Sequence, residues 1–511
     1  MSTNRHQNVA RGKRRIAHRL RPIAWTAQPL PMLTARNIHY DVSGRTRGLT
    51  AGGIGAMHLL AQHAGLVDAL DQEVQVLKRH LPCHESDHIL GIAYTLLSGG
   101  TCLQDIEQRR QDEVYLDALG AQWIPDPTTA GDLCRRFDAA SLEALQRAIN
   151  ATRVRVWRTQ PAAFFDEAVL EADGTLAPTT GACKEGMDIA YNGTWAYHPL
   201  LVSLANTAEP LFVINRAGNR PSAEGATARL DQAIALCRTA GFRRVTPCGD
   251  TDFMQTTELD RWDGAPVRFL FGYDARANVV RLADALPAAA WTPLARPPAY
   301  TVQTTPRQRP ANVKEAVIVE RAFKNLRLQG EAVAEFPYQP TACARPYRMV
   351  VLRKNISVEQ GDQRLFDDIR YCFYLTNDRT TPVSEIVFLA NDRCNQENLI
   401  DQLKHGVRAM ALPTDTLLSN GAYMVMAALA WTLKAWFALR LPITGRWAAR
   451  HTAERQAVLR MEFKAFLQAF LLIPAQAIRT SRRIIFRLLA WTPWQTVLLR
   501  GVDHLRAPLR C

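Results

Sequence analysis

The sequence lacks the cysteine and glycine patterns that mark several common protein classes. Its ten cysteines are scattered singly, with no Cys-x-x-Cys pair and no Cys/His cluster at zinc-finger spacing. This scatter predicts a reducing compartment and argues against a zinc finger. There is no P-loop, so ATP dependence is not indicated, and Gly53-Ile54-Gly55 lacks the third glycine of a dinucleotide site.

Long apolar runs are also missing. The longest, Ala422 to Leu433, ends at Lys434 and falls short of the roughly 20 residues that a membrane span needs. The basic N-terminus is not followed by the apolar region of a secretory signal. We therefore expect a cytoplasmic protein with no membrane partner.

Lysine is scarce in a chain that is otherwise strongly basic. Only nine of the 62 basic residues are Lys and 53 are Arg, and the net charge is +14. This excess favours a polyanionic partner, and the planar arginine fork suits phosphate oxygens. The charge lies mostly at the two ends: residues 431–511 carry 14 Lys or Arg against three acids, and no acid precedes Asp41.

Hydrophobic periodicity divides the 511 residues into regions of different type. Strands are expected near 168–172, 198–205, 211–214 and 244–248, with a helix at 223–239, which together make a mixed α/β sheet unit. The regions expected from these patterns are a basic flexible arm (1–45), a helical domain (46–160), an α/β core (161–275 and 371–430), a β-rich insertion (276–370) and a basic helical C-terminal region (431–511).

The segment from Asn391 to Lys404 is predicted to be one helix, with Asn391 or Asp392 as its N-cap. At 100° per residue, Arg393, Glu397 and Lys404 share one face. A carboxylate flanked by two cations suits a metal ligand between phosphate clamps, although a solvated face with an i,i+4 ion pair is the alternative. Four apolar residues lie on a different face and are expected to pack inward: Leu399, Ile400, Leu403 and Val407.

Two acidic motifs follow predicted strands of the α/β unit. Glu171-Ala172-Asp173-Gly174 ends the first strand, and Gly249-Asp250-Thr251-Asp252 follows the fourth. A carboxylate on a central strand is costly to bury unless it binds a cation, so a metal role for Asp173 is reasonable. The alternative at Asp173 is an Asp-Gly turn that closes a hairpin, and a Gly-Asp turn is also common at a strand end.

Together these motifs resemble the active site of insertion-sequence DDE transposases, which have a ribonuclease-H-like fold. Enzymes of that family place one Asp on the first strand, a second after the fourth strand, and a Glu on a later helix with the signature Y-x2-R-x3-E-x6-K. Arg393, Glu397 and Lys404 match this signature, and Ala390 occupies the Tyr position. The resemblance covers about residues 50–440 and includes three further segments: Tyr191 to Leu201, Asn215 to Arg220 and Arg348 to Arg353.

The resemblance implies a ribonuclease-H-like core and a cut-and-paste DNA transposase associated with the bacterial nucleoid. Such an enzyme binds the terminal inverted repeats of its element, cleaves at the ends and joins the 3′-ends to target DNA. The helical domain (46–160) is then expected to be the DNA-binding domain that recognises the repeats. Asp173, Asp250 and Glu397 are implied as catalytic ligands of two Mg²⁺ ions, which Mn²⁺ can replace. Arg393 and Lys404 are implied to bind DNA, and a homodimer is expected in the synaptic complex.

Two other functions fit the same residues. One is a catalytically silent DNA-binding protein derived from a transposase, and the other is a structure-specific nuclease on the same fold. Glu171, Asp252 and Asp401 are the nearest alternatives for the three acids. His198 is interpreted as a structural residue of its strand, and Trp291 as packing in the insertion rather than stacking on a base.

Overall fold

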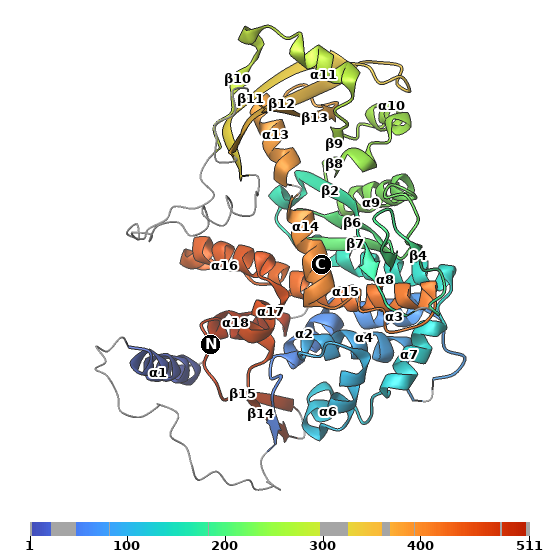
Figure 1. Cartoon of the computed structure of the whole chain (residues 1–511). Helices are drawn as coiled ribbons and strands as arrows, with labels where there is room; N and C mark the ends of the chain where they lie inside the picture. Colours follow the sequence, from blue (N-terminus) through green and yellow to red (C-terminus); the bar gives the residue numbers. More distant parts are fainter. Residues whose placement is uncertain are drawn as a thin grey trace.

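The computed structural model describes residues 3–21, 47–80, 82–181, 183–296, 325–359, 368–392, 394–480 and 483–506. It is a mixed α/β protein built on one large sheet. Figure 1 shows strands β10 to β13 at one end of the molecule and the helices of the N-terminal half at the other, with the long helix α15 between them.

The large sheet has nine strands. In spatial order they are β10 (Thr292–Pro293), β11 (Asn325–Tyr338), β12 (Tyr347–Glu359), β13 (Asp368–Thr376), β9 (Leu270–Tyr273), β8 (Arg244–Gly249), β2 (Glu167–Gly174), β6 (Leu200–Leu204) and β7 (Glu209–Ile214). Strand β8 pairs in parallel with both β2 and β9, and the other pairs are antiparallel. The four strands expected near 168–248 are thus confirmed, and the expected helix is α9 (Ala226–Ala240).

The strands expected in the insertion belong to this same sheet. Strand β13 pairs with β9, and β12, β11 and β10 follow it edge to edge. Trp291 packs beside them, with the Arg353 guanidinium 4.4 Å from its ring centre. The ring is half-buried and packs against the hydrophobic core, as expected for this residue, and the cation covers one of its faces. Two short helices flank this part of the sheet: α10 (Leu259–Gly264) and α11 (Ala277–Asp284).

A helical region precedes the sheet, as the apolar spacing of the sequence predicted. Its helices are α2 (Ile54–His63), α3 (Leu66–Glu73), α4 (Glu85–Leu97), α5 (Ile106–Arg110), α6 (Glu113–Leu119), α7 (Pro127–Arg135) and α8 (Ala139–Trp157). Side chains make several of the caps: Asp126 accepts from the amide of Thr129, and Asp138 from that of Ser141.

Helix α15 (Leu417–Leu439) runs through the core and packs against α4, α8 and β7. By length and composition it could cross a membrane, but its most apolar stretch is entirely buried inside the protein. The apolar run in the sequence is shorter than the helix, because the helix also contains buried polar residues such as Asn420. The Asn420 side chain hydrogen-bonds to Thr414.

A buried carboxylate joins three core elements. Glu209 of β7 accepts hydrogen bonds from Arg153 Nε (3.0 Å) and Trp157 Nε1 (2.9 Å) of α8, and from Trp436 Nε1 (2.8 Å) of α15. Thr207 Oγ1 donates a fourth bond at 2.6 Å. Since Arg153 and Glu209 are 1 % and 0 % exposed, the pair is held by complete hydrogen bonding.

The C-terminal region was expected to be helical throughout, and this was wrong. Helices α16 (Ala448–Arg460), α17 (Phe463–Phe466) and α18 (Gln495–Leu505) are present, but a hairpin of β14 (Ala475–Thr480) and β15 (Arg483–Leu488) lies between them. Strand β14 also pairs with β1 (Gly48–Leu49). Alternate burial of Ala475 and Ala477 reveals the two-residue period that the basic composition obscured.

Part of the N-terminal arm is a helix rather than flexible chain. Helix α1 spans Thr3–Arg19, and Arg5 forms an ion pair with Asp503 of α18 at 3.1 Å. The Trp491 side chain lies close to Gly12 of α1. Tertiary contacts with the C-terminal region therefore order a basic segment that composition alone assigned as a tail.

Candidate active site

The two aspartates predicted from strand ends come from neighbouring parallel strands. Strands β2 and β8 pair so that Glu171 lies opposite Cys248. Asp173 lies two residues after Glu171, and Asp250 lies two residues after Cys248. Parallel strands bring their carboxyl ends to one edge of a sheet, so both side chains reach the same edge. A hairpin turn directly after Asp173, the alternative for this motif, is not what the structure has.

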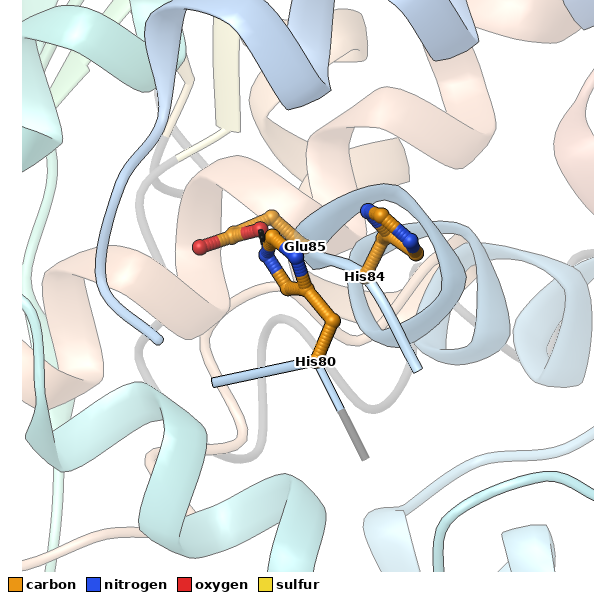
Figure 2. A group of neighbouring side chains, drawn as sticks. All are labelled: His80, His84 and Glu85. Atoms are coloured by element: carbon orange, nitrogen blue, oxygen red, sulfur yellow. Dashed lines mark hydrogen bonds and ion pairs between the residues drawn. The ribbon is translucent and has the colours of Figure 1, made fainter. Parts of the chain in front are cut away.

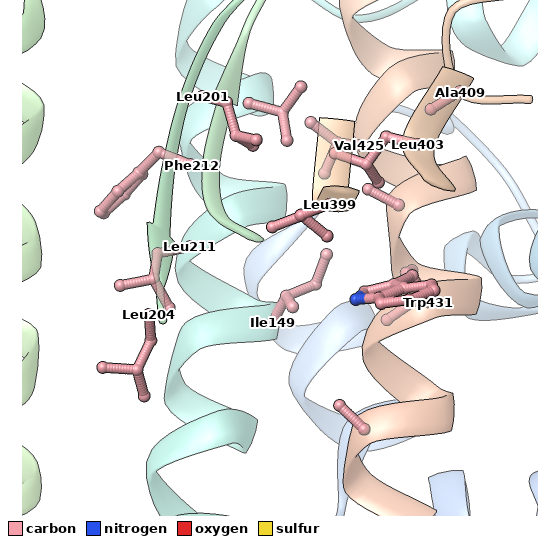
Figure 3. Packing of buried hydrophobic residues seen from close by; sticks show 14 of the residues in the cluster. Ile149, Leu201, Leu204, Leu211, Phe212, Leu399, Leu403, Ala409, Val425 and Trp431 are labelled. Carbon is pink, nitrogen blue, oxygen red and sulfur yellow. The ribbon is translucent and has the colours of Figure 1, made fainter. Parts of the chain in front are cut away.

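The glutamate comes from a helix that packs across the sheet. Helix α13 spans Val383–Asp392, and α14 spans Cys394–Asp401 and carries Glu397. The four apolar residues expected to pack inward are all buried: Leu399, Ile400, Leu403 and Val407. Figure 3 shows Leu399 and Leu403 packed with Val425 and Trp431 of α15. In addition, the buried Gln396 hydrogen-bonds to Ser203 of β6, so α14 is fixed while Glu397 stays exposed.

The expected N-cap at Asn391 or Asp392 is wrong, because both residues already lie inside a helix, and the expected α-helix does not continue to Lys404. Residues 383–392 already form α13, and after Asp401 the chain continues as a π-helical turn over Gln402–Gly406. The wider turn changes the angular spacing, so the calculation at 100° per residue does not hold at Lys404. Arg393 lies outside the described residues.

The three predicted carboxylates line one cavity of about 780 Å³, called the acidic cavity below. Asp173 and Asp250 are half-buried in its wall, and Glu397 is exposed beside them. Local hydrogen bonds orient the aspartates: Asp173 Oδ1 accepts from the Gly174 amide at 2.8 Å, and Asp250 Oδ1 from the Asp252 amide at 3.0 Å. Three segments remote in sequence therefore present acids to one open space.

Lys404 lies close to the acidic cavity. Burial lowers the pKa of its ammonium, while the charges of Asp401 and Asp173 act in the opposite direction. The side chain is half-buried, and the Coulomb interaction with Asp173 places its charge near the end of β2. Lys404 is thus within electrostatic range of Asp173, although it does not line the acidic cavity.

The alternative acids occupy different positions. Asp252 also lines the acidic cavity. Glu171 is 3 % exposed and lines a separate cavity of about 210 Å³ that it shares with Arg268. Asp401 is exposed, with His405 3.8 Å away. Of these three, only Asp252 could replace a predicted acid without a change in the chain's path.

A small hairpin, called the rim hairpin, forms part of the mouth of the acidic cavity. It consists of β4 (Asp188–Ile189) and β5 (Trp195–Tyr197), which form a separate three-stranded sheet with β3 (Ala177–Pro178). Ile189 and Tyr191 line the cavity and are 57 % and 86 % exposed. Sequence reasoning used Tyr191 only for the family resemblance. A large aromatic residue beside an Asn-Gly turn was the signal for an exposed ring.

A loop after β7 forms another part of the wall and was also missed as a site element. It brings Arg220 to the cavity, where the side chain is exposed and pairs with Glu224. Arg216 holds the loop, because its guanidinium donates to the carbonyl oxygens of His198, Pro221, Ser222 and Glu224. Burial lowers the pKa of Arg216 to about 10, so it is still charged at neutral pH.

His198 is part of the wall and is held rigidly. It is 4 % exposed, and its Nδ1 lies 2.9 Å from the Arg220 carbonyl oxygen. A Cβ added at Gly174 would lie 2.7 Å from His198 Nε2, so the glycine leaves the imidazole room beside Asp173. Burial lowers the pKa of His198, which favours the neutral ring. These contacts support the structural role expected for this histidine.

The donor set of the acidic cavity fits a hard divalent cation. Its acids supply only carboxylate oxygens, which Mg²⁺ and Mn²⁺ prefer.

Comparison with known proteins identifies the family of this chain. The family described as "Transposase DDE domain group 1" matches residues 30–509. This chain belongs to that family of DDE transposases. It is therefore a DNA transposase of a family whose members normally use divalent metal ions, and family membership implies DNA cleavage and transfer.

Among solved structures, the chain is similar to one described as "Cryo-EM structure of piggyBac transposase synaptic complex with hairpin DNA". The identity is 8 %, the match covers 83 % of this chain and 81 % of that one, and the TM-score is 0.34. No curated protein matches the sequence.

Proposed function

We propose that this protein binds the terminal inverted repeats of an insertion sequence, cleaves at the element ends and joins the 3′-ends to target DNA. The observation that carries the proposal is the convergence of Asp173, Asp250 and Glu397 on one cavity. In this proposal β2, β6, β7, β8 and α9 belong to a ribonuclease-H-like core, and the helices before the sheet bind the repeats.

The proposed metal site consists of Asp173, Asp250 and Glu397, which would hold two Mg²⁺ ions. When bound, the ions stabilise charge on the attacking and leaving oxygens of an in-line phosphoryl displacement. The chain's own part is to fix the carboxylates through the parallel register of β2 and β8 and the packing of α14. Asp252, on the same wall, keeps Asp250 in place through its backbone amide.

Cationic side chains would position the DNA strand. Lys404 carries its charge close to Asp173, and Arg220 is exposed on the opposite loop of the cavity wall. We propose that both contact phosphates next to the scissile bond, with Arg393 as a third contact by the family signature. Phosphate contacts of this kind fix the register of the strand without reading its sequence.

The basic surface outside the cavity would supply general DNA affinity. Residues 431–511 hold 14 Lys or Arg against three acids, and α1 adds further arginines. Affinity from such charges falls steeply with salt. Because an element has two ends, we propose that a homodimer holds both in the synaptic complex, in the bacterial cytoplasm where nucleoid DNA is accessible.

A strand-transfer assay tests the proposal and separates it from the two alternatives. The substrates are labelled duplexes that carry matched inverted repeats from the DNA flanking the gene, mixed with supercoiled target and Mg²⁺. Joined product is the expected result. Cutting without joining would point to a nuclease, and shifted but intact DNA to a silent binding protein. A duplex of scrambled repeat sequence is the matched control.

A further inference from the structure

A second cluster of metal-ligating side chains lies in the helical region, and none of its residues lines the acidic cavity. His80 precedes α4, His84 is the residue at the helix start, and Glu85 is the first residue of the helix. One ligand atom from each lies within 4.8 Å of the other two. Figure 2 shows the His80 ring lying across the Glu85 carboxylate, with His84 beside them.

Glu85 is built as a fixed anionic ligand. It is 2 % exposed, and its Oε1 accepts from the amides of Leu77 at 3.0 Å and Val76 at 3.2 Å. Burial would raise the pKa of the carboxyl, but these backbone donors and His80 outweigh it, so the pKa is lowered. The second oxygen, Oε2, faces His80 Nε2 at 3.0 Å. A carboxylate held in this way stays ionised and keeps one oxygen directed at the imidazoles.

The two imidazoles lie face to face. Their rings are stacked, with centroids 4.0 Å apart and planes 22° from parallel. Both side chains are exposed, so they can move by the small distance that coordination requires. Two ligands of a tetrahedral zinc ion lie roughly 3.3 Å apart, given bond lengths of about 2.0–2.1 Å. The separation of 3.0 Å between His80 and Glu85 is already close to that value.

We propose that His80, His84 and Glu85 bind a transition-metal ion of the zinc class, which fixes the connection between α3 and α4. Two imidazole nitrogens and one carboxylate oxygen select such an ion over Mg²⁺, and a water completes the coordination. A metal ion bound at His80 Nε2 would take the place of the hydrogen bond to Glu85 Oε2, and the single proton of the neutral imidazole would then lie on Nδ1. Cys83 is buried and is not among the residues whose ligand atoms converge here.

The spacing explains why the sequence did not predict this site. His80 and His84-Glu85 do not follow a zinc-finger pattern, and the nearby Cys83 is buried away from the group. The path of the chain after α3 turns His80 back over the start of α4. There, Ser86 is tied to Asp71 of α3 by two hydrogen bonds, from its amide at 2.9 Å and its hydroxyl at 3.0 Å. Tertiary contacts between α3 and α4 thus assemble the donor set.

The test is a calorimetric titration of the full-length, EDTA-stripped protein with Zn²⁺ in the presence of excess Mg²⁺. The Mg²⁺ fills sites made of oxygen ligands but competes poorly for imidazole nitrogens. We expect a single Zn²⁺ per chain. The affinity should fall by more than about tenfold in both His80→Asn and His84→Asn, since even outer-shell changes cost that much. Cys83→Ala and His18→Asn should bind as the parent does.

A second readout reports on the connection itself. Zn²⁺ should slow hydrogen exchange at the Val76 and Leu77 amides, which donate to Glu85, in the parent chain and not in His84→Asn. Absence of Zn²⁺ binding in the parent would overturn the proposal. So would unchanged affinity in either histidine variant, or loss of Zn²⁺ from Cys83→Ala, which would assign a different ligand set.

Discussion

Asp173 and Asp250 reach the same cavity because the register of β2 against β8 places Glu171 opposite Cys248, two residues before each aspartate. A shift of one residue in either strand would turn one aspartate to the other face of the sheet. The other edge of β2 pairs with β6, where Asp173 lies opposite Leu201, and this pairing also fixes the position of β2. The position of these acids is therefore a property of the sheet and not of a local loop.

Loss of any one of the three acids should abolish strand cleavage while binding to end DNA persists. Asp173→Asn, Asp250→Asn and Glu397→Gln each remove a negative charge from the acidic cavity with little change in volume. Gel assays of cleavage and of shift on the same labelled duplex measure the two activities. Asp274→Asn is the matched control, since Asp274 follows β9 as Asp250 follows β8 but does not line the cavity. Retained cleavage would remove that acid from the assignment.

Tyr191→Ala should weaken binding to substrates that expose unpaired bases at the cut site. Its ring is 86 % exposed at the mouth of the acidic cavity, and stacking of a base on such a ring contributes about 1–3 kcal/mol. The dissociation constant from fluorescence anisotropy should rise by roughly five- to 150-fold, and Tyr191→Phe should restore it. Trp447→Ala, at another exposed aromatic outside the cavity, is the control. An equal effect in both variants would contradict a specific contact.

Gly218→Ala should destabilise the rim hairpin. A Cβ at this position would collide with the carbonyl oxygens of Ala196 and Asp188, one on each strand of the hairpin. Backbone cannot yield as a side-chain tip can, so we expect a loss of about 1–3 kcal/mol in the free energy of unfolding and reduced cleavage. Thermal unfolding and the cleavage assay measure these effects. Gly264→Ala, where nothing lies within 4 Å, should behave as the parent.

Arg153→Met should destabilise the core by about 3–5 kcal/mol, because it leaves the Glu209 carboxylate buried without its cation. Urea unfolding followed by tryptophan fluorescence reports the loss, since Trp157 and Trp436 both donate to Glu209. Arg147→Met, on the exposed side of the same helix, should lie within about 0.5 kcal/mol of the parent. A double variant with Glu209→Leu should recover part of the stability, and no recovery would contradict this account.

Lys434 should make stability depend on pH. It is fully buried in α15, donates to the Leu459 carbonyl oxygen at 2.7 Å and lies 3.7 Å from the Trp431 ring centre. Burial lowers its pKa to about 7 from 10.5 in the unfolded chain. Between these values the unfolded state binds more protons, so stability rises with pH, by at most about 1.4 kcal/mol per unit.

The rise attributed to Lys434 should be absent in Lys434→Met, which removes the titrating group from the core. Lys464→Met, at an exposed lysine of α17, should keep it. Urea midpoints measured at intervals from pH 7 to 10 test this directly. An identical pH profile for the parent and Lys434→Met would show that burial of this ammonium does not govern the dependence.

The family of this protein was readable from the sequence, because the acidic motifs and the R-x3-E-x6-K spacing are local. The apolar face of the α14 segment was readable for the same reason, since Leu399 and Leu403 follow helical periodicity. The direction in which Lys404 projects from the helix could not be predicted, because the π-helical turn over Gln402–Gly406 breaks the helical period. The hairpin of β14 and β15 was missed where basic composition hid a two-residue alternation.

The sequence by itself determined the chemistry available: which acids end which strands, and where the basic charge lies along the chain. Only the tertiary structure decided which of these segments lie next to one another. It joined the insertion strands to the core sheet and brought Tyr191 and Arg220 to the rim of the acidic cavity. It also turned His80 over Glu85. The physical reason is that strand pairing and packing between distant segments depend on non-local burial, which no short stretch of residues encodes.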